Sequence, residues 1–179
     1  MKVSLPVFLS VILLVAGNSM GAVKQGDTEI NAMGGWADLS DKDGTSFNYE
    51  ILLAAGAVNY FVTDNVQVGA GLMGIWIDYS DNDKANIYGL GTTAKYHFMT
   101  NQTYCPYVGA QFYFAKFDSD NSADDMDGIA WGPVAGVRFE LNEKNDFYVE
   151  YDHVMFNGDL GDELDDAGLL IMGIVHQFK

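Results

Sequence analysis

The sequence predicts an all-β fold, an eight-stranded antiparallel up-and-down transmembrane β-barrel. Three observations predict it. Apolar and polar residues alternate along eight segments, a polar turn or loop separates each segment from the next, and the last segment ends on Phe178, one residue before the sequence ends. Because successive side chains of a strand point to opposite faces, alternation gives a segment one apolar and one polar face. A sheet in hydrocarbon must close on itself, since no backbone amide can stay unpaired there.

The eight segments are long enough to cross a membrane as tilted strands. They cover residues 27–39, 47–61, 66–79, 86–98, 104–117, 128–141, 146–157 and 167–178. The first and third segments alternate weakly. The eighth is apolar on both faces in its first half, so its outward face is assigned from Phe178 and its inward face from Gln177.

Alternation also predicts which side chains face lipid and which face the barrel interior. In the fourth segment, Leu90 faces lipid and Lys95 faces the interior. In the second, the same rule turns Leu53 and Ala57 towards lipid and Glu50 inwards. Aromatic residues near the ends of strands are typical of the girdles at the two membrane interfaces. The aromatic residues assigned to the lipid face are Phe47, Tyr49, Trp76, Tyr96, Phe98, Trp131, Phe139, Phe147 and Phe178.

The connections between segments alternate in length and in charge. Three of them are short and turn-like, at residues 62–65, 99–103 and 142–145. Four are acidic, at residues 41–46, 80–85, 118–127 and 158–166, and the last two of these are longer. Short turns on the periplasmic side and longer loops on the extracellular side are the arrangement of outer-membrane barrels.

Residues 1–22 are predicted to be a signal peptide. Lys2 gives a short positive start, residues 5–16 are largely apolar, and Ser19 and Gly21 fit the small-residue rule for cleavage after Gly21 or Ala22. The apolar run is too short for a comfortable membrane span of roughly 20 residues, which disfavours a single membrane anchor. The remaining residues, 23–179, are predicted to form one outer-membrane β-barrel domain.

The composition excludes some classes of function. There are 25 acidic residues against 9 Lys and Arg, giving a formal net charge of −16. Nucleic-acid binding requires a basic face, so this balance argues against it. Hydrophobic residues make up 49% of the chain, yet the mean hydropathy is only +0.01. This combination is typical of alternating strands. The single cysteine, Cys105, cannot form an intramolecular disulfide.

Two stretches carry a resemblance to a known family. The strand–turn–strand sequence Tyr60–Val66 and the terminal sequence Ile174–Phe178 resemble the OmpA/OmpX-type eight-stranded bacterial outer-membrane barrels, with Lys179 after the aromatic as a departure. The resemblance implies location in the outer membrane, contact with its lipids and lipopolysaccharide, and insertion by the barrel-assembly machinery. A soluble barrel of lipocalin type would show the same alternation with its faces reversed. The signal peptide, the asymmetry of turns and loops, and Phe178 favour the membrane form.

Charged residues are predicted on the interior faces of several strands. They are Glu50, Lys95, Arg138, Glu140, Glu150 and Asp152. Charges inside a barrel must pair or be hydrated. The resemblance implies a plugged interior with salt bridges, and pairing in a filled core is the interpretation favoured here. The alternative is a narrow polar pore.

The acidic loops provide the candidate metal ligands. These are Asp118, Asp120, Asp124, Asp125 and Asp127. Carboxylates at this density can bind calcium, but the stretch lacks the glycine that an EF-hand loop requires at its sixth position. A solvated loop with weak binding of divalent cations is the favoured interpretation, and no cofactor is expected. Catalytic residues are not predicted either, because His153 has no serine two residues away on its strand face.

We therefore expect an integral outer-membrane barrel with a structural or surface-interaction role that presents acidic extracellular loops. The alternative is a narrow pore or a carrier for small apolar molecules across the outer membrane. Enzymatic activity is disfavoured.

Overall fold

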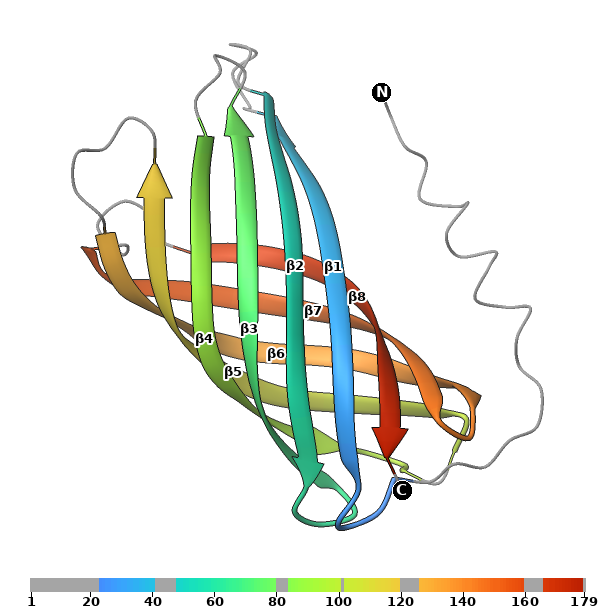
Figure 1. The fold of residues 1–179 in the computed structure, drawn as a ribbon. Coiled ribbons are helices and arrows are strands. Elements are labelled where there is room, and N and C mark those ends of the chain that lie inside the picture. Colours follow the sequence, from blue (N-terminus) through green and yellow to red (C-terminus); the bar gives the residue numbers. More distant parts are fainter. Residues whose placement is uncertain are drawn as a thin grey trace.

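A computed structural model describes residues 23–40, 48–79, 84–100, 102–119, 126–159 and 166–178. These residues form a closed barrel in which each strand pairs antiparallel with its neighbours in sequence and β1 pairs with β8 (Figure 1). The strands are β1 (Thr28–Ser40), β2 (Asn48–Phe61), β3 (Val66–Tyr79), β4 (Lys84–His97), β5 (Tyr104–Ser119), β6 (Met126–Asn142), β7 (Asn145–Gly158) and β8 (Asp166–Phe178). The predicted fold class, strand number and strand order are confirmed. Among the described residues, no helix is long and apolar enough to span a membrane.

Side chains close the short connections at the end of the barrel where the C-terminus lies, which we call the turn side (Figure 1). Between β2 and β3, the Thr63 hydroxyl accepts hydrogen bonds from the backbone N–H groups of Asn65 and Val66 at 3.2 and 2.9 Å. Between β6 and β7, the Asn142 side-chain oxygen accepts from the N–H groups of Lys144 and Asn145, both at 3.1 Å. Short polar side chains thus replace ladder bonds where the chain reverses. The opposite end is the loop side.

The outer surface of the barrel is apolar. Leu72 and Phe114 are about two-thirds exposed, and Leu52, Leu90, Leu170 and Ile174 are more than half exposed. Polar side chains such as Gln67, Gln111 and Gln177 are buried inside. The facing predicted for β4, β6 and β7 and for the end of β8 agrees with this pattern. Such an outer surface is suited to hydrocarbon, and the interior is suited to hydrogen bonding.

The facing predicted for β2 is wrong. Leu53 and Ala57 are buried inside the barrel, while Leu52, Val58 and Tyr60 are exposed on its outer surface. The reason is that β2 is apolar on both faces over much of its length, so alternation does not show which face points inwards there. The reversal also removes the argument that placed Glu50 inside, and the Glu50 side chain lies outside the described ones.

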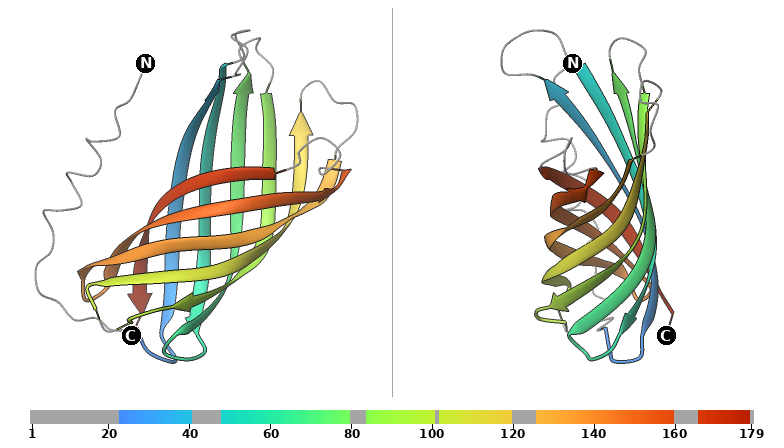
Figure 2. Two further views of the ribbon diagram at one scale, coloured as in Figure 1. Left: turned by 180° about the vertical axis from the view of Figure 1, so that it is seen from behind. Right: turned by 90° about the vertical axis from the view of Figure 1, so that its left-hand side faces the viewer.

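The closing seam between β1 and β8 is shorter than the other pairings. Its register runs from Thr28↔Phe178 to Gly34↔Met172. β1 continues to Ser40, paired only with β2, and β8 starts at Asp166, paired only with β7. Figures 1 and 2 show β8 turning away from β1 towards the loop side. Among the described residues, the facing backbone edges of β1 and β8 therefore have no strand partner in this half of the barrel.

Candidate functional site

The interior is divided into two zones. The half near the turns holds a turn-side polar network, made of Glu29, Gln67, Lys95, His97, Arg138, Asp146, Glu150 and Gln177, all buried. The half near the loops holds a cavity with mostly apolar walls. The two zones meet near the middle of the barrel, at Gln111 of β5 and Asp152 of β7.

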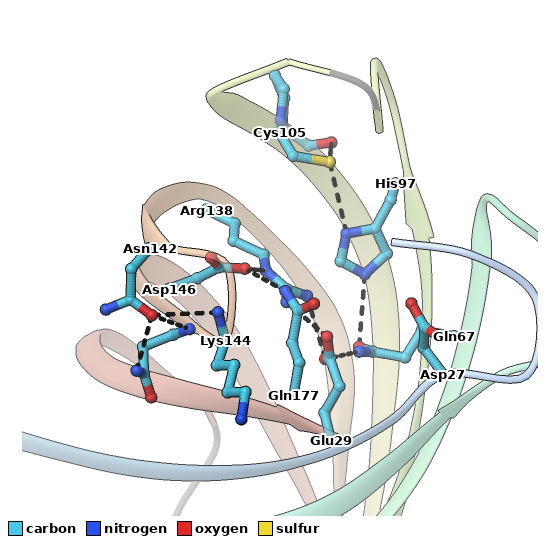
Figure 3. A network of polar contacts seen from close by, with 12 residues as sticks. Asp27, Glu29, Gln67, His97, Cys105, Arg138, Asn142, Lys144, Asp146 and Gln177 are labelled. Atoms are coloured by element: carbon cyan, nitrogen blue, oxygen red, sulfur yellow. Dashed lines mark hydrogen bonds and ion pairs between the residues drawn. The ribbon is translucent and has the colours of Figure 1, made fainter. Parts of the chain in front are cut away.

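Arg138 is the centre of the polar network (Figure 3). Its two terminal nitrogens donate to the two carboxylate oxygens of Glu29 at 3.0 and 2.5 Å. Its Nε donates to Asp146. A guanidinium holds carboxylates in this forked geometry better than an ammonium does, because its N–H groups are fixed in one plane. One side chain of β6 therefore ties β1 and β7 together through the interior.

Amides and an imidazole extend the network from Arg138. Gln67 of β3 donates to Glu29 at 2.7 Å, and Gln177 of β8 donates to Asp146 at 3.0 Å. His97 of β4 lies 3.4 Å from the Gln67 side-chain oxygen. The Cys105 thiol donates to the Phe98 carbonyl at 3.0 Å, which makes it a buried structural thiol. The ring of His97 also packs on Phe61 and Tyr107 at centroid distances of 5.1 Å.

Lys95 forms the second ion pair. Its ammonium lies 2.5 Å from Glu150 of β7. It also lies 5.0 Å from the ring centroid of Tyr107 and 5.9 Å from that of Tyr148. Aromatic faces stabilise a cation within about 6 Å. The Lys95 ammonium is therefore enclosed by a carboxylate and two aromatic rings, with little room for water.

The tyrosines fit inside the barrel because each of three faces a glycine on the neighbouring strand. The register pairs Tyr107 with Gly136, Tyr113 with Gly91 and Tyr148 with Gly173. A Cβ at Gly136 would lie 2.5 Å from the Tyr107 ring and hydroxyl, and one at Gly173 would lie 2.5 Å from the Tyr148 hydroxyl. The rings thus occupy the space that a side chain at each glycine would fill. Within the network only about 20 Å³ stays open, which is room for about one water molecule.

The cavity in the other half, the loop-side apolar cavity, has a volume of about 350 Å³. Its walls come from all eight strands and include Leu53, Ile75, Ile87, Val154, Phe156 and Ile171. Most of these are also the buried apolar core of the molecule. The lining extends from Gln111 and Asp152, which border the polar network, to Ile77 and Asp166 near the loop-side strand ends. The volume is at the small end of the roughly 300–1,000 Å³ range of ligand pockets.

The polar floor of this cavity carries an unsatisfied group. Asp152 is 3% exposed, and its Oδ1 has no hydrogen-bond partner among the described residues. Gln111 and Glu150 are buried as well, and Gln111 lines the cavity as Asp152 does. A buried oxygen without a donor costs about 1–3 kcal/mol. Asp152 also lines the cavity, so it is the charged residue at the end that borders the polar network.

The structure brings together part of the predicted charged set. Lys95, Arg138, Glu150 and Asp152 are all buried in the interior. Glu140 is half-buried near the turn-side end of β6, and it has an interaction of its own.

Sequence reasoning missed both carboxylates that hold Arg138. Asp146 is on the same strand face as Glu150 and Asp152, so alternation along β7 was a sufficient signal. Glu29 is on β1, where Glu29 and Asn31 alternate with Ile30 and Ala32; Glu29 and Asn31 are buried and Ile30 is exposed. This short polar alternation was the available signal.

Of the five candidate metal ligands, two lie within the described residues and three lie outside them. Asp118 and Asp127 are exposed near the loop-side ends of β5 and β6. Asp120, Asp124 and Asp125 lie outside the described residues. Within the described part of the chain, no group of three or more His, Cys, Asp or Glu side chains is placed to hold a metal ion.

Comparison with known proteins identifies the family. A family model described as the outer membrane protein beta-barrel domain matches residues 8–178. The chain belongs to this family. The fold, the apolar outer surface and this match place the protein in the bacterial outer membrane, where the barrel sits in the lipid bilayer. A search of curated proteins finds no match.

Solved structures support the fold. Neisserial surface protein A has a TM-score of 0.66 and 18% identity, covering 86% of this chain and 100% of that chain. The N-terminal β-barrel domain of Pseudomonas aeruginosa OprF has a TM-score of 0.58 and 22% identity, covering 87% and 99%. Ail, the attachment invasion locus protein of Yersinia pestis, has a TM-score of 0.54 and 14% identity, covering 86% and 99%. At these identities the likeness shows a shared fold and no more.

Proposed function

We propose that this outer-membrane barrel binds a small apolar molecule in its loop-side half and does not conduct. The observation that carries the proposal is the loop-side apolar cavity, which has a volume of about 350 Å³ and is lined mainly by apolar side chains, among them Leu, Ile, Val and Phe. Apolar walls gain about 25 cal/mol per Å² when an apolar molecule covers them. The role is one of binding, and no catalytic step is assigned to it.

The turn-side polar network supports the non-conducting part of the proposal. Arg138 and Lys95 cross the interior to three carboxylates at hydrogen-bonding distance. An ion moving through the barrel would have to break these pairs, and each break would leave a charge buried without its partner. The interior therefore favours a cup that is closed towards the periplasm over the narrow pore considered from the sequence.

A surface-interaction role is a second proposal, and it is compatible with the first. Asp118, Asp127, Asp159 and Asp166 are exposed at the loop-side ends of the strands, and the connecting segments beyond them are acidic. We infer that this end presents negative charge to the medium, to lipopolysaccharide or to divalent cations. Residues 1–22 are proposed as the signal peptide and 23–179 as the mature barrel inserted by the barrel-assembly machinery.

Binding is tested with the neutral fluorescent probe N-phenyl-1-naphthylamine. The folded protein is placed in phosphatidylcholine nanodiscs, and the signal of empty nanodiscs is subtracted. Ala55 lines the cavity and Ala54 is exposed on the outer surface. Ala55→Phe fills the cavity, and Ala54→Phe is the matched control. Saturable binding to the wild type and to the control, lost in Ala55→Phe, is the expected result. Equal signals from all three proteins would overturn the proposal.

Conductance is tested separately in a planar bilayer. The wild-type protein is expected to give no stable current steps, because the turn-side polar network fills the interior. Regular ohmic steps would show that the network is open in the membrane and would favour the pore.

A further inference from the structure

The loop-side apolar cavity is polar at the end that borders the polar network, although the rest of its walls is mostly apolar. Asp152 lines the cavity together with Gln111, and its Oδ1 lacks a donor among the described residues. A purely apolar ligand would leave this oxygen unsatisfied. The floor is therefore suited to a molecule that brings a hydrogen-bond donor at one end of an apolar body.

The buried charges around this end of the cavity indicate which kind of hydrogen-bond donor a ligand would bring. Among the described residues, four carboxylates are buried, from Glu29, Asp146, Glu150 and Asp152, against the two buried cations Lys95 and Arg138. Both cations already pair with other carboxylates: Lys95 with Glu150, and Arg138 with Glu29 and Asp146. Asp152 is thus the buried carboxylate without an ion pair of its own.

Asp152 also has a carboxylate neighbour. Glu150 is two residues away on the same inward face of β7, and it pairs with Lys95. Two carboxylates this close repel unless a proton or a second positive group lies beside them. A cation bound in the cavity beside Asp152 would offset this repulsion.

We propose that the cavity takes a small linear amphiphile with a protonated amine head, an alkylammonium ion, whose head donates to Asp152 while its chain lies against Leu53, Ile75 and Ile171. This proposal rests on the proposed function, because it requires that the cavity binds ligands. An anionic head would add a third negative charge at the floor. A hydroxyl head would satisfy Oδ1 but would leave the charge uncompensated.

The test compares ligands that share a chain and differ in the head group. Octylammonium, 1-octanol and octanoate compete with N-phenyl-1-naphthylamine for the protein in phosphatidylcholine nanodiscs at pH 7, where the amine is charged. Ala55→Phe nanodiscs give the background from partition into lipid. Octylammonium is expected to displace the probe at about one-tenth of the octanol concentration, because charge-assisted hydrogen bonds are roughly twice as strong as neutral ones. Octanoate is expected to be the weakest competitor.

Asp152→Asn is the matched variant, since it keeps the shape of the side chain and removes its charge. It is expected to lose the tenfold preference for octylammonium over 1-octanol, whatever its own affinity for the probe. If the variant does not fold, the wild-type series of head groups still decides.

The outcomes separate the two proposals. Probe binding with equal affinities for octylammonium and octanol would overturn the amine proposal and leave the cavity-binding function intact. An amine preference that persists in Asp152→Asn would also overturn the assignment to Asp152. Loss of probe binding in the wild type would overturn the proposed function and this inference with it.

Discussion

Arg138 on β6 and Glu29 on β1 pair through the interior of the barrel, with the guanidinium 2.5 Å from the carboxylate. Their strands are not neighbours, since β7 and β8 lie between them. The contact therefore links β1 to β6 across the interior, at the end of the barrel where β1 and β8 are still paired. Asp146 shares the same guanidinium.

Removing Arg138 is expected to destabilise the barrel strongly. Arg138→Ala leaves Glu29 and Asp146 buried without their cation, and breaking a buried pair in this way costs about 3–5 kcal/mol. The expected result is a clearly lower unfolding temperature, measured by circular dichroism of the folded protein in detergent. Lys144→Ala is the control, since Lys144 is exposed in the β6–β7 turn, and it is expected to unfold like the wild type. An unchanged temperature for Arg138→Ala would indicate that water replaces the arginine and that the interior is open.

The pairing of tyrosine with glycine gives a second prediction. A Cβ at Gly136 would lie 2.5 Å from the Tyr107 ring, and only about 20 Å³ stays open within the network that the ring borders. Gly136→Ala is expected to cost about 1–3 kcal/mol through overpacking. Gly56→Ala is the matched control, because its Cβ would meet nothing closer than 3.5 Å. Urea unfolding of both variants checks the difference. Equal stability would mean that Tyr107 can swing away, and that the polar network is less tightly packed than the distances indicate.

Much of the fold could be predicted from the sequence, because membrane strands obey a strict rule. In β4, Leu90 and Lys95 differ so clearly in polarity that their facing follows at once. Strand ends are marked by polar turns such as the one at Thr63 and Asn65. The number, order and approximate limits of the strands were therefore accessible from alternation together with the polar turns and loops between segments.

The cavity could not be predicted, and the physical reason is specific. Leu53, Ile75 and Ile171 face the interior but have the side chains of lipid-facing residues. A strand that separates hydrocarbon from an apolar cavity is apolar on both faces, so the alternation disappears there. The polar network was accessible in part, since Arg138 and Lys95 stand out on their strands. Their partners depend on which strands face each other across the barrel, which is three-dimensional information.

The short seam between β1 and β8 leads to a prediction on amide exchange. Beyond Gly34↔Met172 the β8 backbone pairs with β7 alone. The N–H groups of residues 166–171 that point away from β7 are expected to exchange with solvent at least about tenfold faster than those of β7, because fully paired strands open least. Hydrogen–deuterium exchange of the protein in nanodiscs measures this. Equal protection on both strands would mean that the seam closes fully in the bilayer.

The last prediction concerns the acidic loop side and divalent cations. Asp118 and Asp127 are exposed there, and the residues between them include Asp120, Asp124 and Asp125. Exposed carboxylates without a preformed cage bind calcium weakly, and we expect a dissociation constant of about 10⁻⁴–10⁻³ M. Calorimetric titration of the folded protein with calcium measures it.

Two triple variants distinguish diffuse attraction from a defined calcium site. The first changes Asp120, Asp124 and Asp125 to Asn. The second changes Asp162 and Asp165 to Asn and Glu163 to Gln, in the other long acidic segment. Because diffuse attraction depends on total charge, both variants are expected to weaken binding to a similar degree, and added salt is expected to weaken it further. Micromolar binding that the first variant abolishes and the second leaves unchanged would instead show a preformed site between β5 and β6.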